Sequence, residues 1–192
     1  MARVPYVDPE SFPDDHELLE TSMDPDDLPE AYREAFSTGP RHVHRAIGND
    51  PGALRAFRES IRGFWRESGL TDRQRELTIL AVARASDARY EWHQHVRHGL
   101  SVGLAPEEIR AVGREEYDGF PEDEASLLAY AAATGRGTVD DGTFERFEAR
   151  FDRGTVVGTT MLAGSYAGLA RALDAMGVEP EEAFVGWELE GL

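Results

Sequence analysis

The sequence contains neither cysteine nor lysine, and both absences restrict what the protein can do. Without cysteine, the chain forms no disulfide, binds no metal through thiolates and performs no thiol redox chemistry of its own. No apolar run approaches the roughly 20 residues that span a bilayer. The opening residues Met1–Pro5 lack the apolar segment of a signal peptide. We therefore expect a cytoplasmic protein with one main domain, the usual outcome for 192 residues.

The charge is strongly one-sided. The chain has 37 acidic residues against 20 bases, all of them arginine, for a net charge of -17. A nucleic acid or an anionic membrane needs a basic surface, so the composition argues against both partners. The acidic residues are spread along the chain, which suits a protein kept soluble in concentrated salt, where charge repulsion is screened. We favour a halophilic, haloarchaeal host over the alternative of an ordinary acidic protein from a mesophile.

The first part of the chain has the composition of an extended arm. Residues 1–30 hold ten acids, five prolines and a single arginine, a mixture that cannot bury enough apolar surface to fold alone. Four apolar side chains can dock it on the rest of the chain or on another subunit: Phe12, Leu18, Leu19 and Met23. We expect an acidic, proline-rich arm over 1–30 and a helical domain over 31–192.

From about residue 30 the apolar pattern is helical, and no segment alternates as a strand does, so the predicted fold class is all-α. Thr71 and Gln74 form a capping-box pattern, and Pro106 suits the first turn of a helix. Gly135 and Gly177 suit helix ends. The expected helices cover 29–36, 40–47, 51–67, 72–85, 88–102, 106–114, 122–134, 140–150 and 154–176.

Two of these helices carry side chains that suit acid–base chemistry. Glu76 extends the apolar stripe of the 72–85 helix and therefore points inward, where a carboxylate needs a partner or a proton. Glu91 and His95 lie one turn apart on the 88–102 helix. A semi-buried histidine beside a carboxylate titrates near neutral pH, as general acid–base catalysis requires. Spacing alone fits an ordinary helix pair equally well.

A metal site is the less favoured interpretation of the same helix. Glu91, His95 and His98 are spaced i, i+4 and i+7 on one face, and such a set can bind a divalent cation. A metal site usually takes ligands from a second element. His42 and His44 are two residues apart and do not face each other in a helix. We therefore expect no metal and no other cofactor.

Four separated motifs resemble the carboxymuconolactone decarboxylase family, within the alkylhydroperoxidase-D-like superfamily. They occur in the family's order between about residues 40 and 178: Arg75–Leu77, Tyr90–His95, Gly103–Ile109 and Ser165–Arg171. The resemblance implies an alkylhydroperoxidase-D-like helical bundle. It also implies a homo-oligomer, a trimer or a hexamer, and the glycine-rich helix over 154–176 would permit close helix approach.

The resemblance also limits the chemistry. Redox members of the superfamily carry a glutamate, then a Cys-x-x-Cys pair, then a histidine three residues on. In this chain the glutamate falls on Glu76 and the histidine on His95, whereas Ala88 and Glu91 stand at the cysteine positions. A thiol peroxidase is therefore excluded. Lactone decarboxylases of the family also lack the cysteines and place a glutamate four residues before the histidine, as Glu91 precedes His95 here.

The resemblance thus implies cofactor-free decarboxylation or isomerisation of a small unsaturated carboxylic acid or lactone. His95 is the expected proton donor, oriented by Glu91, with Glu76 completing a relay. Tyr90 and Trp92 are expected to line the pocket, although core packing also explains Trp92. The alternative is a non-catalytic helical oligomer that binds a small acid or a partner protein. An enzyme requires the two glutamates and the histidine to converge at a cavity.

An anionic substrate also requires an arginine or a helix N-terminus. Arg84 and Arg89 are near these residues in sequence, but the pattern does not place either one at a pocket.

Overall fold

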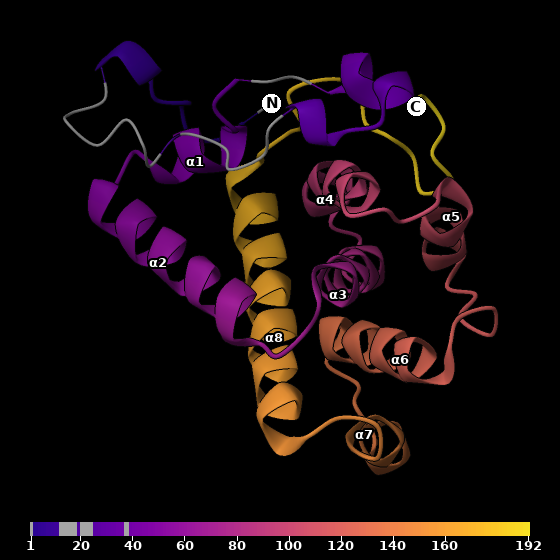
Figure 1. The fold of residues 1–192 in the computed structure, drawn as a ribbon. Coiled ribbons are helices and arrows are strands. Elements are labelled where there is room, and N and C mark those ends of the chain that lie inside the picture. The colour runs from indigo at the N-terminus through magenta and orange to yellow at the C-terminus, as the bar shows by residue number, and fades with distance from the viewer. Residues whose placement is uncertain (1, 12–18, 20–24, 37–38) are drawn as a thin grey trace.

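The computed structural model describes residues 2–11, 19, 25–36 and 39–192, and this part of the chain is helical without any strand (Figure 1). The all-α prediction is confirmed. Phe12, Leu18 and Met23, expected to dock the arm, lie outside the described residues. The α-helices are α1 (His42–Ile47), α2 (Pro51–Glu67), α3 (Asp72–Ala85), α4 (Arg89–Ser101), α5 (Pro106–Arg114), α6 (Glu122–Arg136), α7 (Asp141–Glu148) and α8 (Arg153–Met176). Among the described residues, short 3-10 helices precede them at η1 (Pro9–Ser11), η3 (Pro25–Asp27) and η4 (Glu30–Ala35).

Local signals set most helix boundaries. The Thr71 hydroxyl accepts from the Gln74 backbone N–H at 3.2 Å, and the Gln74 side chain accepts from the Thr71 backbone N–H at 3.1 Å. This capping box begins α3 as predicted, because it satisfies backbone donors that lack a partner in the first turn. Pro106 begins α5, and Gly177 ends α8 with a positive φ of 67°.

The predicted helix end at Gly135 is wrong. Helix α6 continues to Arg136, and Gly137 takes the left-handed conformation, with φ of 70°, that ends it. Gly135 instead lies where α6 meets α3. A Cβ atom there would be 3.1 Å from both the Ser86 hydroxyl and the Val82 carbonyl oxygen. The glycine is needed for the close approach of two helices, a reason that sequence spacing does not reveal.

Helix α3 is the centre of the bundle, with α4, α6 and α8 around it (Figure 1). Its residues 76–83 are all buried. Most of them are aliphatic, and their burial is the main source of stability for such a helix. The consequence for function is that Glu76, which belongs to this run, is held inside the bundle.

The described part of the arm packs on its own chain. The Arg3 backbone N–H donates to the Met176 carbonyl at the end of α8 at 2.7 Å, and the Val7 N–H donates to the Arg45 carbonyl at 3.1 Å. Leu28 joins the main core with 4% of its surface exposed. The arm therefore contributes to the packing of the domain that follows it.

The segment after α8 returns across α4 and α5 (Figure 1). The Trp92 indole of α4 donates to the Gly186 carbonyl at 3.1 Å, and its ring lies 5.1 Å from that of Trp187. This C-terminal segment, residues 177–192, closes one side of the bundle.

Candidate active site

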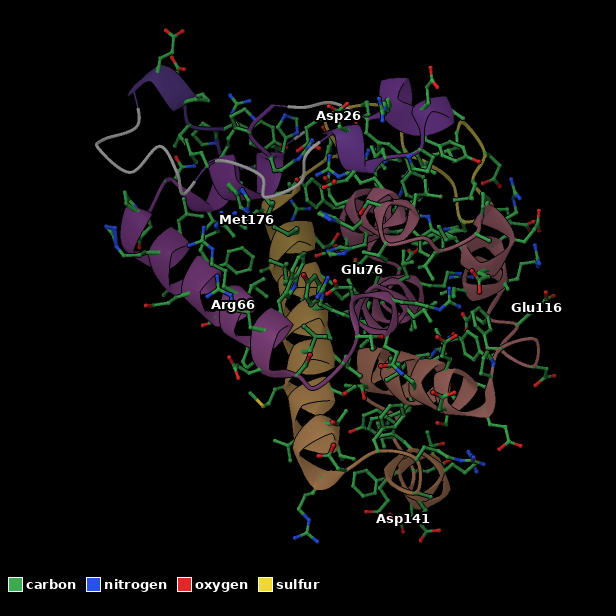
Figure 2. All side chains as sticks on the ribbon, viewed as in Figure 1. Asp26, Arg66, Glu76, Glu116, Asp141 and Met176 are labelled. Carbon is green, nitrogen blue, oxygen red and sulfur yellow. The ribbon has the colours of Figure 1, made fainter. Side chains whose placement is uncertain are left out.

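Helices α3 and α4 bring Glu76 and His95 into direct contact. His95 Nδ1 lies 2.7 Å from Glu76 Oε2, and Glu76 is fully buried. An ionised carboxylate only accepts hydrogen bonds, so Nδ1 carries the proton and donates it. The other oxygen, Glu76 Oε1, accepts from Arg75 Nε at 3.1 Å. Figure 2 labels Glu76 in the middle of the bundle.

Glu91, which was expected to orient His95, is buried without holding the His95 ring. It is 3% exposed, and its Oε1 has no hydrogen-bond partner in the described part of the chain. Burial raises the pKa of Glu91 to about 7, opposed by a hydrogen bond from its own backbone. The contact that fixes the His95 ring is made by Glu76, nineteen positions away in sequence, and not by Glu91 on the same helix.

A cavity of about 330 Å³ lies between α2, α4 and α8. This size is typical of small-molecule sites. Glu91, His95 and Tyr90 line it, and Glu76 lies behind His95. The structure thus brings the two glutamates and the histidine together at one cavity. Glu91 and His95 line its wall, and Glu76 lies behind the wall in contact with His95.

Trp92 does not line this cavity. Its indole is fully buried on the opposite side of α4, against the C-terminal segment. Trp92 was expected to line the pocket, but its side chain packs in the core instead, because its position on α4 faces α5 and Trp187.

Tyr90 lines the cavity, but its hydroxyl is held by the C-terminal segment. It donates to Glu181 Oε1 at 2.9 Å and accepts from the Val43 backbone N–H at 3.1 Å. Gln94 donates to the other Glu181 oxygen at 2.6 Å. Burial, followed by the charge of Glu181, raises the pKa of Tyr90 well above its ordinary value. Tyr90 therefore shapes the wall as a neutral phenol.

Trp65 and Tyr166 form an aromatic wall that the sequence did not reveal as part of the site. The Trp65 indole donates to the Tyr166 hydroxyl at 2.8 Å. The Tyr166 ring meets His95 edge-on, with centroids 5.1 Å apart. The two aromatic residues are 101 positions apart, on α2 and α8, so only the helix packing could identify the pair.

His98 lies beside His95, with ring centroids 5.2 Å apart. Burial, and then the neighbouring His95 and Arg97, lower the pKa of His98 well below its ordinary value, so its imidazole is neutral. Among the described residues, no group of three or more histidines and carboxylates is arranged to hold a metal ion. Glu91, His95 and His98 share a cavity without forming such a group.

The cavity is rich in arginine. Arg84 and Arg89, the two nearest in sequence to the site, lie elsewhere: Arg84 over the Trp187 ring and Arg89 over the Phe184 ring. The arginines of the cavity come from α2, α3, α4 and the residue before α1, and they are Arg41, Arg58, Arg62, Arg66, Arg75 and Arg97. The chain as a whole has a net charge of -17, yet these arginines concentrate positive charge around the cavity. This local positive charge favours an anionic ligand.

Comparisons with known proteins agree with this architecture. Residues 51–133, from α2 into α6, match the model of the carboxymuconolactone decarboxylase family, and the match includes Glu76, Glu91 and His95. A comparison with curated proteins gives no sequence match. The match contains three of the four motifs and confirms the family resemblance, whereas Ser165–Arg171 lies beyond the matched residues.

Solved structures share the fold. The debrominase Bmp8, as a cysteine-to-alanine variant with 2,3,4-tribromopyrrole, matches with a TM-score of 0.76 and 13% identity, over 93% of this chain and 91% of that one. A protein of unknown function from Agrobacterium tumefaciens, described as a candidate AhpD antioxidant defence protein, gives 0.64 and 21% over 70% and 94%. An uncharacterised peroxidase-related protein of Ralstonia eutropha gives 0.61 and 17% over 90% and 95%. The predicted alkylhydroperoxidase-D-like fold is confirmed.

Proposed function

We propose that this protein, whose residues 51–133 match the model of the carboxymuconolactone decarboxylase family, is an enzyme of proton-transfer chemistry. Its substrate is a small unsaturated carboxylic acid or lactone, which it decarboxylates or isomerises without a cofactor. The observation that carries the proposal is the 2.7 Å contact between buried Glu76 and His95 at the wall of an arginine-lined cavity.

In this proposal His95 moves the proton. Glu76 holds Nδ1–H, so Nε2 is the nitrogen left to face the substrate. When His95 takes or holds a second proton, the Glu76 carboxylate stabilises the imidazolium, as a buried carboxylate does for other catalytic histidines. The Trp65 and Tyr166 rings restrict the imidazole to one orientation.

Glu91 supplies a second titrating group in the same cavity. A pKa of about 7 leaves it part protonated at neutral pH, which suits a group that both gives and accepts a proton. In decarboxylation, the bond to the carboxyl carbon breaks, carbon dioxide leaves and the remaining electron pair spreads into the adjacent unsaturated system. The carbon then receives one proton, from Glu91 or His95.

The chemistry of two structural neighbours does not transfer to this chain. Antioxidant defence and debromination are named for those proteins, and the Bmp8 variant was made by replacing a cysteine. This chain has no cysteine and has Ala88 and Glu91 where redox members carry the pair. A mechanism through a thiolate therefore has no nucleophile here.

We also propose that the protein is a homo-oligomer, a trimer or a hexamer. Val157 and Met161 of α8 are 57% and 49% exposed, and Gly164 and Gly168 continue the same stripe with open space beside them. This apolar, unobstructed helix face suits close contact with a second copy. Light scattering on the wild type and on Met161→Glu tests it: the variant should have a lower mass, and a wild-type monomer would refute it.

Turnover of a panel of lactones and unsaturated diacids tests the main proposal, with carbon dioxide release and deuterium uptake from D₂O as readouts. His95→Ala should abolish turnover while keeping the fold, and His42→Ala, a histidine outside the cavity, serves as control. Full activity in His95→Ala would refute the mechanism. Saturable binding of these acids with no turnover by the wild type would support the non-catalytic alternative.

A further inference from the structure

Three arginines of α2 form a row along the cavity. Arg58, Arg62 and Arg66 follow one another at i, i+4 and i+8, and all three line the cavity that contains His95. A helix rises 1.5 Å per residue, so the row is about 12 Å long. Figure 2 labels Arg66 on α2. The row belongs to the outer side of the cavity, because Arg62 and Arg66 are exposed whereas His95 is buried.

The two exposed members of the row lack a carboxylate partner. Other exposed arginines of this acidic chain form ion pairs, for example Arg33 with Asp26 at 3.2 Å and Arg150 with Glu122 at 2.6 Å. In the described part of the chain, neither Arg62 nor Arg66 forms an ion pair or a hydrogen bond, although Glu59 and Glu67 lie on the same helix. Their charge is thus available to a ligand.

The inner arginines, in contrast, face carboxylates of the protein. Arg75 contacts Glu76 at 3.1 Å and Asp72 at 2.6 Å. Glu181 and Glu182 of the C-terminal segment act electrostatically on Arg41 and Arg97. The positive charge that the protein does not balance therefore lies at the outer end, away from the Glu76–His95 pair.

Arg58 is held in the row by a neutral histidine. His44 Nδ1 donates to the Leu19 carbonyl at 3.3 Å, so its Nε2 accepts from Arg58 Nη1 at 2.9 Å. Burial, and then the charge of Arg58, lower the pKa of His44 to about 3. His44 therefore orients Arg58 without adding a negative charge to the row.

We propose that the row binds a phosphate or pyrophosphate group, carried by the substrate at the end remote from its reacting carbon. Residues one turn apart on a helix have Cβ atoms about 5–6 Å apart, so Arg62 and Arg66 can grip one dianionic phosphate. Guanidinium groups bind phosphate bidentately. Trp65 and Ile61 lie along the same cavity and fit an apolar body between the two ends. The assignment of the reacting end rests on the proposed function.

Calorimetric titration with inorganic pyrophosphate, and with inorganic phosphate, tests the row without any turnover. The wild type should bind one pyrophosphate per chain saturably. The double variant Arg62→Ala/Arg66→Ala should lose at least tenfold in affinity. Arg55→Ala removes an arginine of the same helix outside the cavity lining and should bind as the wild type does. No saturable binding, or equal losses in the double variant and in Arg55→Ala, would overturn the proposal.

Two further binding measurements separate the phosphate site from the proposed function and from a protein-docking surface. His95→Ala should keep full pyrophosphate affinity, so a protein that binds pyrophosphate but turns over no acid retains the phosphate site and loses only the proposed function. Polyglutamate stands for an acidic protein segment. If polyglutamate binds at the row and pyrophosphate does not, the row is a docking surface for protein and the phosphate assignment is wrong.

Discussion

The Glu76 carboxylate and the His95 imidazole form a buried hydrogen bond of 2.7 Å between the central helix α3 and its neighbour α4. The contact assigns a proton to Nδ1 and leaves Nε2 for the cavity. Glu76 is the most deeply buried acid of the site, and it holds the His95 ring at the cavity wall. The proposed chemistry depends on this pair.

Replacing Glu76 with glutamine should lower kcat by about 10²-fold or more, because a neutral amide does not stabilise an imidazolium at His95. Carbon dioxide release under saturating substrate measures it. Glu124→Gln is the matched control: Glu124 is also a buried glutamate bound to an arginine, Arg73, but it lies outside the cavity. Equal activity in Glu76→Gln and in the wild type would remove the relay from the mechanism.

The activity of the wild type should fall as the pH rises through about 7, if Glu91 delivers the proton, because its protonated form disappears there. Glu91→Gln should be slower at every pH and should lack this falling limb, since glutamine does not titrate. The measurement is kcat against pH from 5 to 9 for both proteins. A limb of the same shape in the variant would assign the titration to another group.

Stability provides an independent check on Glu91. Its pKa is about 7 in the fold and 4.5 by its ordinary value. Ionisation is thus penalised in the fold, and stability is lost as the pH rises from about 4.5 to 7. At about 1.4 kcal/mol per pKa unit, the loss is on the order of 3 kcal/mol. In urea unfolding, the free energy of unfolding of Glu91→Gln relative to the wild type should be higher at pH 8 than at pH 5. A constant difference between the two proteins would contradict the raised pKa.

Two helix glycines should respond to alanine in opposite ways. A Cβ at Gly158 of α8 would lie 2.6 Å from the Ser68 Cα, so Gly158→Ala should cost about 1–3 kcal/mol through overpacking against backbone. Gly63 is exposed on α2, and nothing lies within 4 Å of a Cβ there. Gly63→Ala should therefore gain about 0.5–1 kcal/mol from the lower backbone entropy of the unfolded chain. Thermal unfolding distinguishes the two variants, and a loss of stability in Gly63→Ala would contradict the second expectation.

The helices were largely predictable. The bounds of α2, α3 and α5 agree with the prediction, because caps and apolar spacing act within a few residues. The end of α6 could not be predicted in this way, since the role of Gly135 depends on its contact with α3. For Trp92, the sequence left pocket lining and core packing open, and the structure shows core packing against the C-terminal segment.

By itself, the sequence determined the helical fold, the family resemblance, the absence of thiol chemistry and the inward position of Glu76, since each depends on composition or on spacing within one helix. Only the tertiary structure decided that Glu76, and not Glu91, holds His95, and that six arginines surround the cavity. It also joined Trp65 to Tyr166. The physical reason is that such contacts depend on how separate helices cross, and the periodicity of one helix fixes its buried face but not the residues that this face meets.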